Sequence, residues 1–376
     1  MKILFVDATA AYDGRSSSLG PLGGTQSAVA HLAVALARAG VGVIVANRRA
    51  ADVTDQGVDW VSLARIQQSF AAYLRAQGAT HLVFASAAAL ATLRAKVAWD
   101  GAWVLWNHCW IDQPASAPLA DAAVRDSWDA FVSISEFQHA GMANAFALPP
   151  ERHWILRNAI SPHFVSLFSG WDEFHAVRHL RTATRWAYSS TPFRGLDVLA
   201  AAWLRLSANP DWSCTAVSGM QLYGQGDDAF QALFDTIAAT PGMTRLEPMG
   251  QAALARALAE HDFWAYPCTF PETSCISALE AVAAGLYPVT TALGALPETL
   301  EGWGTFVPPD GDRLVERWCE AALAQARIRD TDRGAWLHAC WTQRERVVRE
   351  WNWDHRAREW IACLERVRGR ARVPGD

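Results

Sequence analysis

The sequence contains no uninterrupted apolar run of about 18 residues, so we expect no segment of it to span a membrane. Its first apolar run, Ile3–Val6, is too short for a secretory signal peptide and ends at Asp7. The seven cysteines are scattered and form no CxxC pair, which argues against a zinc ribbon and a disulfide framework. These absences favour a protein of the reducing cytoplasm.

The sequence also lacks a strong excess of charge of either sign. Its net charge is −5 at pH 7, so no global field would recruit nucleic acid. The C-terminal tail is locally basic, with Arg366, Arg368, Arg370 and Arg372. We interpret this tail as a solvated chain end. The alternative is contact with anionic lipid, which would make the protein peripheral at the inner face of the membrane.

What the sequence does have is length, hydrophobic residues and tryptophan. A chain of 376 residues predicts two domains of ordinary size, and its 51% hydrophobic content predicts large buried cores. We expect most of the nineteen tryptophans to lie in these cores. Because sugar rings stack well on indole, a few are candidates to line a carbohydrate site.

Short apolar runs alternate with helical patterns along the first part of the chain. A helix is predicted over Thr25–Gly40, where apolar residues recur with a helical period and a glycine ends the pattern. The apolar runs predict buried strands at 2–7, 42–47, 81–85, 102–106, 130–134 and 153–157. Such alternation is typical of an α/β domain with a doubly wound parallel sheet.

The pattern pauses in a loop-like crossing at Asn158–Asp172 and then restarts. Further strands are predicted at 184–190, 213–219, 262–266 and 287–291, and helices from Gly195 and over 252–260, 312–325, 333–350 and 354–368. Two α/β units joined by one crossing predict a cleft between them, with ligands at the carboxyl ends of the strands.

The segment PETSCISALEAVAAG contains two acidic residues, Glu272 and Glu280. It predicts a helix with Glu272 at its start, and at about 100° per residue the two carboxylates would lie roughly 80° apart. The free N–H groups of a helix N-terminus suit an anion such as a diphosphate, and the carboxylates would accept hydrogen bonds from sugar hydroxyls. The segment therefore indicates a nucleotide-sugar site. The alternative is two glutamates on a helix surface.

A glycine-containing loop, LGGTQ, follows the first predicted strand. Gly23 and Gly24 permit close approach of the backbone to a ligand, and Thr25 is predicted to cap the following helix. The alternative is an ordinary tight turn between strand and helix. The G-x-G-x-x-G fingerprint is absent, which argues against a nicotinamide enzyme.

Two more candidate positions in the first part of the chain follow predicted strands. His108 comes just after the strand at 102–106 and is a candidate polar group near a reacting centre, the alternative being a loop histidine without a role. Ser135 and Gln138 predict a capping box, which we favour over a ligand contact by Ser135 or Glu136.

Arg194 is the candidate cation of the second unit. It precedes Gly195 at a predicted helix start, where it would neutralise a diphosphate, the alternative being a surface arginine. The loops at 218–224 and 249–251 are better interpreted as plain loops, unless a cleft makes them the border of a base pocket.

With these motifs, the chain resembles a family 4 glycosyltransferase of the retaining GT-B class over nearly its whole length. Glu272 and Glu280 match the family's E-x7-E motif, and Ala295–Glu298 matches its G-x-P-E turn. Further similarity lies in the glycine loop at 23–26, the RNAI segment at 157–160 and the closing helical segment at 351–364.

The resemblance implies two Rossmann-like, doubly wound domains facing a cleft. Residues 1–165 would form an acceptor-binding domain and residues 166–350 a domain that binds the nucleotide sugar. Residues 351–376 would form a helix that returns to pack on the N-terminal domain.

The resemblance also implies roles for individual residues. Catalytic roles fall to His108 at the reacting end of the sugar, Glu272 at the hydroxyls of the donor sugar and Arg194 at the leaving phosphate. Glu280 would hold the ribose, and Gly24 would offer its N–H to the diphosphate or the acceptor. The full set of implied donor-binding residues is Gly23, Gly24, Ser189, Gly195, Thr273, Ser274, Cys275, Ile276 and Glu280.

The implied reaction transfers a hexose from a nucleoside-diphosphate sugar to a glycan, lipid-linked or small-molecule acceptor, with retention of anomeric configuration. No metal or other cofactor is implied, because cations and the helix dipole would stabilise the leaving diphosphate. Neither the base, the sugar, the acceptor nor the oligomeric state follows from the sequence.

One departure from the family concerns the cations. The family usually has an arginine five residues before its phosphate-binding lysine, whereas this chain has Ser189 and Arg194 at these two places. This departure keeps open a rival interpretation, a catalytically silent GT-B protein that binds a sugar nucleotide or a protein partner. A GT-B epimerase or phosphorylase is a further rival, against which the match at 272–298 argues.

Overall fold

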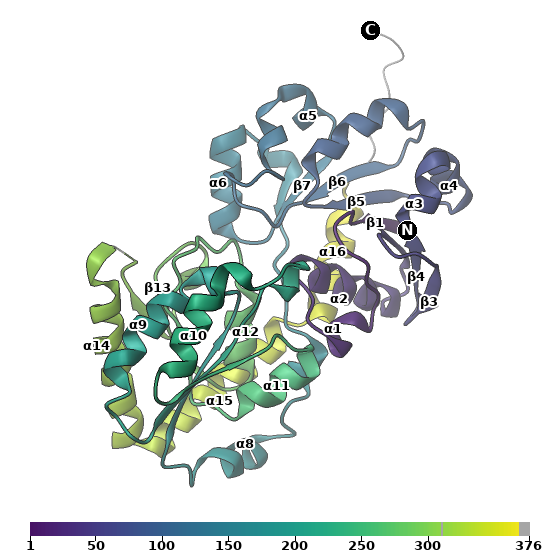
Figure 1. Ribbon diagram of the computed structural model, residues 1–376. Helices are drawn as coiled ribbons and strands as arrows, with labels where there is room; N and C mark the ends of the chain where they lie inside the picture. The colour runs from purple at the N-terminus through teal and green to yellow at the C-terminus, as the bar shows by residue number, and fades with distance from the viewer. Residues whose placement is uncertain (310, 368–376) are drawn as a thin grey trace. The chain divides into compact units, whose positions relative to one another are not determined.

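The computed structural model describes residues 1–309 and 311–367. The chain forms two compact units (Figure 1). The first contains residues 1–16, residues 24–158 and the C-terminal segment from Trp353, and the second contains residues 17–23 and 159–352. Of the basic tail, Arg368, Arg370 and Arg372 lie outside the described residues.

The first unit is built on an eight-stranded sheet, and the second on one of six strands. The order in the first sheet is β3 (Val53–Asp55), β4 (Val58–Ser62), β2 (Gly42–Asn47), β1 (Lys2–Val6), β5 (His81–Ala85), β6 (Ala102–Trp106), β7 (Ala130–Ser133) and β8 (His153–Ile155). All neighbours pair in parallel except β3 and β4. Strands β5 and β6 are buried at every residue, as expected for central parallel strands.

Helices of the first unit cover this sheet. They are α2 (Gly24–Arg38), α3 (Leu63–Ile66), α4 (Phe70–Ala76), α5 (Ala122–Asp126), α6 (Glu136–Phe146) and α16 (Trp353–Leu364), while the short α1 (Ser16–Leu19) begins where the two units meet in the sequence. The predicted cap at Thr25 is wrong, because α2 already begins at Gly24 and Thr25 lies in its first turn.

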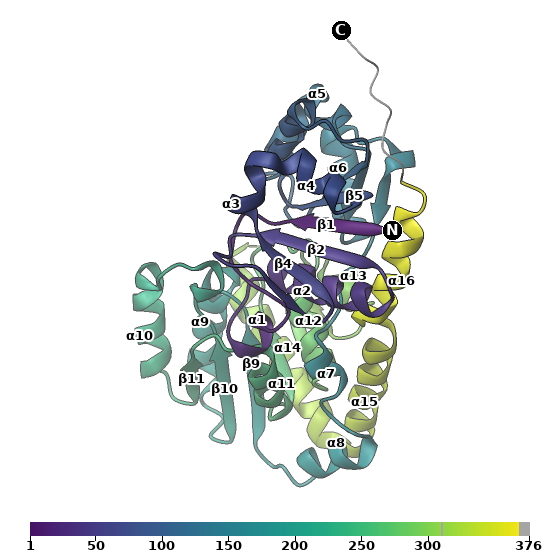
Figure 2. The same ribbon diagram turned by 90° about the vertical axis from the view of Figure 1, so that its right-hand side faces the viewer.

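The return of the C-terminal helix to the first unit is confirmed. Helix α16 packs against α2 (Figures 1 and 2). Its buried Trp360 contacts Phe5 of β1 and Trp106 of β6 edge to face, with ring centroids 6.3 and 4.9 Å apart. The last helix is therefore part of the core of the first unit.

The second unit has a fully parallel six-stranded sheet, whose strands β9, β10 and β11 are seen side by side in Figure 2. The strand order is β11 (Met243–Leu246), β10 (Trp212–Val217), β9 (Thr184–Ser189), β12 (Phe263–Tyr266), β13 (Tyr287–Thr291) and β14 (Thr305–Val307). Together with the first sheet, this arrangement confirms the prediction of two doubly wound α/β units.

Nine helices lie in the described part of the second unit. They are α7 (Pro162–Val165), α8 (Trp171–Arg178), α9 (Leu196–Leu206), α10 (Gln231–Ala239), α11 (Gln251–Ala259), α12 (Ile276–Ala283), α13 (Leu296–Thr299), α14 (Leu314–Thr331) and α15 (Arg333–Glu350). The crossing is thus less loop-like than predicted, since α7 begins at Pro162 with Ser161 as its N-cap.

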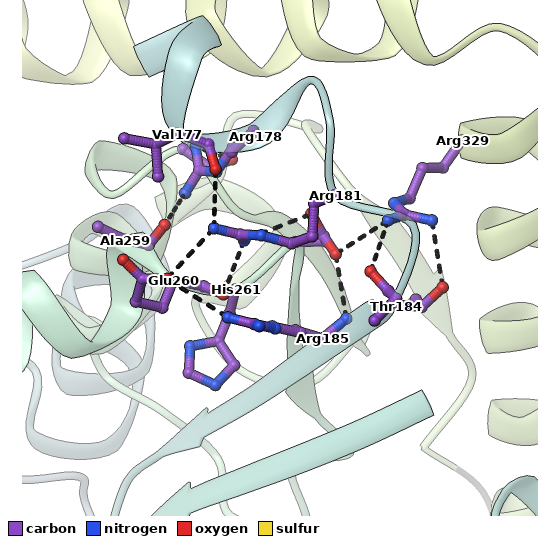
Figure 3. A network of polar contacts seen from close by, with 12 residues as sticks. Val177, Arg178, Arg181, Thr184, Arg185, Ala259, Glu260, His261 and Arg329 are labelled. Atoms are coloured by element: carbon purple, nitrogen blue, oxygen red, sulfur yellow. Dashed lines mark hydrogen bonds and ion pairs between the residues drawn. The ribbon is translucent and has the colours of Figure 1, made fainter. Parts of the chain in front are cut away.

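A buried arginine fixes the C-terminal ends of two helices that matter for the site, and Figure 3 shows its contact with the first of them, at Ala259. Arg178 of α8 has no exposed surface and donates to Ala259 O at the end of α11 (2.9 Å) and to Ala284 O after α12 (2.7 Å). A cation at a helix C-terminus satisfies free carbonyl groups and complements the helix dipole. Helices α11 and α12 are therefore held by one side chain.

Within residues 1–309 and 311–367, no helix is both long and apolar enough to cross a membrane. All seven cysteines are free, and six of them are buried.

Candidate functional site

Arg194 is brought to the site by a sharp turn after β9. Residues Pro192–Arg194 form one turn of 3-10 helix, and Gly195 then starts α9 with a φ of +101°. A Cβ atom at Gly195 would lie 2.1 Å from Pro267 O, so only glycine allows the loops after β9 and β12 to come this close. The glycine thereby sets Arg194 beside the loop that carries Glu272.

The guanidinium of Arg194 is fixed on three sides. It donates to Glu272 Oε1 (2.6 Å) and to the hydroxyl of Tyr223 (3.2 Å), and it lies over the ring of Phe270 at 4.4 Å from the centroid. Its buried Nε–H has no partner in the described part of the chain. Burial is the largest single influence and lowers the pKa of Arg194, but the Glu272 carboxylate together with Tyr266 and Tyr223 outweighs it, so the pKa lies well above the ordinary value. The arginine is therefore a permanent cation.

Glu272 is buried, with 3% of its surface exposed, and connects two elements of the site. The oxygen that accepts from Arg194 also accepts from the Tyr266 hydroxyl at 2.6 Å. The backbone carbonyl of Glu272 accepts from Ala295 N–H at 2.8 Å, which joins it to the ALPE turn. Two matched motifs of the sequence thus meet through one backbone hydrogen bond.

The prediction that Glu272 begins a helix is wrong. Helix α12 begins four residues later, at Ile276, and Cys275 is its N-cap. The Glu272 carbonyl is used by Ala295, so the residues before Cys275 form a loop, and the helical estimate of 80° between Glu272 and Glu280 does not apply. Only Cys275 and Ile276 of the four predicted phosphate-binding residues lie at the helix start, whereas Thr273 and Ser274 precede it.

The start of α12 nevertheless has the chemistry of an anion site. The side chain of its N-cap residue, Cys275, makes no capping hydrogen bond, so it does not satisfy the N–H groups of the first turn. The cation of Arg194 lies on the loop that meets the one before α12. Phosphate binding at Cys275 and Ile276 remains a prediction, with a structural basis in these two features.

Glu280 lies inside α12 with 3% of its surface exposed. Its Oε1 accepts a hydrogen bond of 2.7 Å from Gln251 Nε2, at the first residue of α11. Burial raises the pKa of Glu280 to about 8, and the hydrogen bond from Gln251 only partly opposes that rise. At neutral pH the folded protein therefore holds this carboxyl group largely protonated.

This raised pKa predicts a pH-dependent stability. Glu280 of the unfolded chain ionises above about pH 4.3, whereas the folded protein keeps the proton up to a pKa of about 8. Stability should fall as pH rises from about 4 to about 8, because the folded state binds the extra proton. Glu280→Gln should remove this loss, so its stability relative to wild type should improve between pH 5 and pH 8, by at most about 4 kcal/mol.

Chemical denaturation at both pH values measures the effect. Glu320→Gln, at an exposed position of α14, is the matched control and should show no such pH dependence. An identical stability difference at pH 5 and pH 8 for Glu280→Gln would show that the carboxyl group is ionised in the folded protein.

Ser189, at the place of the family's second cation, points into the core. It is 4% exposed, and its Oγ accepts a hydrogen bond of 3.1 Å from the indole of the fully buried Trp264. This indole occupies space beside Ser189 that a longer side chain would need. Arg194 is therefore not assisted by a cation from position 189.

His108 belongs to the first unit and follows β6 directly. The backbone N–H of His108 donates to Ser86 Oγ at 2.9 Å, and its imidazole ring packs on the Trp106 ring, with centroids 4.5 Å apart. Burial lowers the pKa of His108 to about 3, although a hydrogen bond with Asn158 opposes this shift. The imidazole is therefore neutral at physiological pH. The left-handed backbone of Ser86, with φ of +50°, was not predicted as part of this site.

The remaining candidates, Gly23, Gly24 and Ser135, lie at or next to the starts of two helices of the first unit. Gly23 ends the segment assigned to the second unit, and Gly24 begins α2 of the first. Ser135 caps α6, as predicted, by accepting from Gln138 N–H at 2.9 Å. The Gln138 side chain accepts from Ile134 N–H and donates to Asn107 O, which ties the cap to the residue before His108.

The sequence analysis missed three aromatic residues around Arg194. Tyr266 and Phe270 lie in and after β12, and Tyr223 was included only in a loop that we favoured as having no role. No spacing pattern marks them, because their contacts with Arg194 and Glu272 join three separate loops. A tyrosine that ends a buried strand just before the acidic motif was the one available signal.

No group of three or more metal-ligating side chains occurs among residues 1–309 and 311–367. The polar centre of the second unit consists instead of one cation, two carboxyl groups and the start of α12. Such a set suits an anion joined to a sugar.

Comparison with known proteins gives one family and many similar folds. Residues 185–328 match the model of the glycosyl transferases group 1. A glycogen synthase from Deinococcus deserti is 31% identical over 182 residues, which cover 46% of this chain and 36% of that protein. The aligned region thus spans about a third of the length of this curated relative.

Solved structures match over almost the whole chain. Sucrose-phosphate synthase from Thermosynechococcus elongatus has a TM-score of 0.73 at 17% identity, covering 97% of this chain and 98% of that one. HepE from Anabaena, in complex with UDP and glucose, has a TM-score of 0.67 at 14% identity, covering 97% and 99%. Residues 185–328 therefore resemble the glycosyl transferases group 1, and the chain as a whole has the GT-B fold of these solved structures.

Proposed function

We propose that the protein is a retaining glycosyltransferase that moves a hexose from a nucleoside-diphosphate sugar to a glycan, lipid-linked or small-molecule acceptor. The observation that carries this proposal is the Arg194–Glu272 pair at the carboxyl ends of β9 and β12, 2.6 Å apart. Ligands bind at this end of the strands in open α/β sheets. A UDP complex of the similarly folded HepE supports a nucleotide donor.

In the proposed mechanism, Arg194 and the first turn of α12 hold the diphosphate. Negative charge grows on this group as the glycosidic bond to the sugar breaks. The unpartnered Nε–H of Arg194 and the positive end of the helix dipole stabilise that charge without reorganisation. These two features allow leaving-group stabilisation without a metal, as the resemblance implies.

Glu272 and Tyr266 position the donor sugar. Glu272 keeps Arg194 in place through one carboxylate oxygen, and its remaining acceptor capacity is available to sugar hydroxyls. His108 is assigned to the reacting end of the sugar, where its neutral ring would act as a hydrogen-bond partner and not as a cation. Departure and attack on one face of the sugar would retain the anomeric configuration.

A second candidate function is a silent protein that binds a sugar nucleotide without turnover. The hydrogen bond from Trp264 to Ser189 favours it, because it leaves one cation where the family usually has two. Against it stands the fixed geometry of Arg194, whose three contacts hold it in one orientation.

Turnover with a panel of UDP-, GDP- and ADP-hexoses separates the two functions. Released nucleoside diphosphate is measured with and without glycan and lipid-linked acceptors, and the anomeric configuration of any product is read by NMR. We expect release with one nucleotide class and a product that retains configuration. A protein that binds a sugar nucleotide but releases no diphosphate with any acceptor would be the silent binder instead.

A further inference from the structure

Resting on the proposed function, we propose that Gln251 is a specificity-determining residue that recognises the ribose diol of the donor together with Glu280. The two side chains come from different helices and share one hydrogen bond, from Gln251 Nε2 to Glu280 Oε1 at 2.7 Å. Gln251 keeps its single oxygen as an acceptor, and the protonated carboxyl group of Glu280 keeps a second oxygen that carries an O–H group. The pair thus offers hydrogen-bonding positions to two neighbouring hydroxyl groups.

The amide of Gln251 is only half used by the protein. Its Nε2 donates to Glu280, whereas its buried Oε1 has no partner among the described residues. A buried acceptor without a hydrogen bond is costly, so such atoms are usually satisfied in a native protein by a protein group, a water molecule or a ligand. A ribose hydroxyl would supply the missing donor.

The backbone places Gln251 and Glu280 with little freedom. Gln251 is the first residue of α11, and a Cβ atom on the preceding Gly250 would lie 2.4 Å from Ser18 O. Ser18 belongs to the segment at residues 17–23, so the chain that leads into the predicted glycine loop passes close to the start of α11. The C-terminal ends of α11 and α12 are joined by Arg178, which donates to Ala259 O and Ala284 O.

A ribose fits this pair better than a phosphate does. The unpartnered Gln251 Oε1 is an acceptor, and an ionised phosphate without a proton to donate would leave it unsatisfied. One ribose hydroxyl can donate to Gln251 Oε1, while its neighbour exchanges a hydrogen bond with the second oxygen of the Glu280 carboxyl group. If Gln251 served only to hold Glu280 in place, replacing Gln251 would weaken the binding of UDP and of its deoxy analogues by the same factor.

Calorimetric titration of the full chain with UDP, 2′-deoxy-UDP and 3′-deoxy-UDP tests the proposal. For wild type we expect each missing hydroxyl to weaken binding by about ten- to a hundredfold. The Gln251→Ala variant should bind UDP as weakly as wild type binds one of the two deoxy analogues. In this variant, removing the same hydroxyl from UDP should weaken binding by less than about threefold further. Removing the other hydroxyl should still weaken binding as much as it does in wild type.

Two further variants sharpen the test. Gln251→Glu keeps the acceptor but loses the donor to Glu280, so it should keep part of the preference for the hydroxyl. Gln231→Ala, at the exposed first residue of α10, is the matched control and should leave all affinities unchanged. The folded state of each variant is checked by thermal unfolding.

Different failures have different meanings. Equal weakening of UDP and both analogues by Gln251→Ala would overturn the proposal and leave Gln251 a structural partner of Glu280. Unchanged affinities would overturn it as well. If wild type binds none of UDP, GDP and ADP, both the proposed function and this inference are wrong. If it binds GDP or ADP in place of UDP, the same test is made with the deoxy analogues of that nucleotide.

Discussion

Replacing Arg194 by alanine should lower kcat/KM for the cognate donor by about a hundred- to a thousandfold, as for other preorganised groups that stabilise developing charge. Ser189 provides no second cation, so the leaving diphosphate depends on Arg194 and on the start of α12. Steady-state kinetics with saturating acceptor measures the loss. Arg205→Ala, at an exposed position of α9, is the control and should be near wild type.

Arg194→Lys should restore little of this activity, although the family usually has lysine at this place. The guanidinium of Arg194 donates to two groups at once and lies over the ring of Phe270, which an ammonium group cannot reproduce in the same geometry. Wild-type efficiency in the lysine variant would show that only a point charge matters. Wild-type efficiency in the alanine variant would remove Arg194 from the mechanism, provided that circular dichroism shows both variants folded.

Replacing Glu272 by alanine should lower kcat by about a hundredfold or more, yet change the Kd for the free nucleoside diphosphate by less than about threefold. Glu272 contacts Arg194 and Tyr266 and is assigned to the sugar, so the nucleotide portion of the donor should not depend on it. Removing the carboxylate also removes an anion that competes with the diphosphate for Arg194. This gain in diphosphate affinity offsets any loss that comes from a less fixed Arg194 side chain.

Kinetics and calorimetry on the same preparation separate these two effects. Glu272→Gln keeps the shape and the hydrogen bond from Tyr266 but removes the charge, so it should bind the diphosphate at least as well as wild type. Parallel losses in kcat and in diphosphate affinity would contradict the assignment of Glu272 to the sugar. Unfolding of the alanine variant would restrict the comparison to Glu272→Gln.

The sequence was sufficient for the general fold because the central strands are fully apolar. Runs such as HLVFA at 81–85 and AWVLW at 102–106 are buried at every residue, and their short, unbroken length favours a buried strand over a helix. Four edge or near-edge strands were missed, namely β3, β4, β11 and β14. Strands β3, β11 and β14 have only three or four residues each and are partly exposed, so they lack this apolar signal.

The site was only partly predictable. The family motifs indicated Arg194, Glu272 and Glu280, and the structure joins the first two in an ion pair. The start of α12 was misplaced because the carbonyl of Glu272 bonds to Ala295, which lies 23 residues along the chain and leaves no local signal. The role of Gln251 was equally hidden, since its contact with Glu280 joins two helices.

The central claim is that the second unit holds a nucleoside diphosphate with its ribose at Glu280. Calorimetric titration of wild type and Glu280→Ala with UDP, GDP, ADP and CMP tests it most directly. We predict saturable binding of one diphosphate to wild type and affinity lower by about ten- to a hundredfold in Glu280→Ala, from the loss of a carboxyl group that accepts from the ribose. Equal affinity in a folded Glu280→Ala variant, or no binding of any nucleotide to wild type, would contradict the claim.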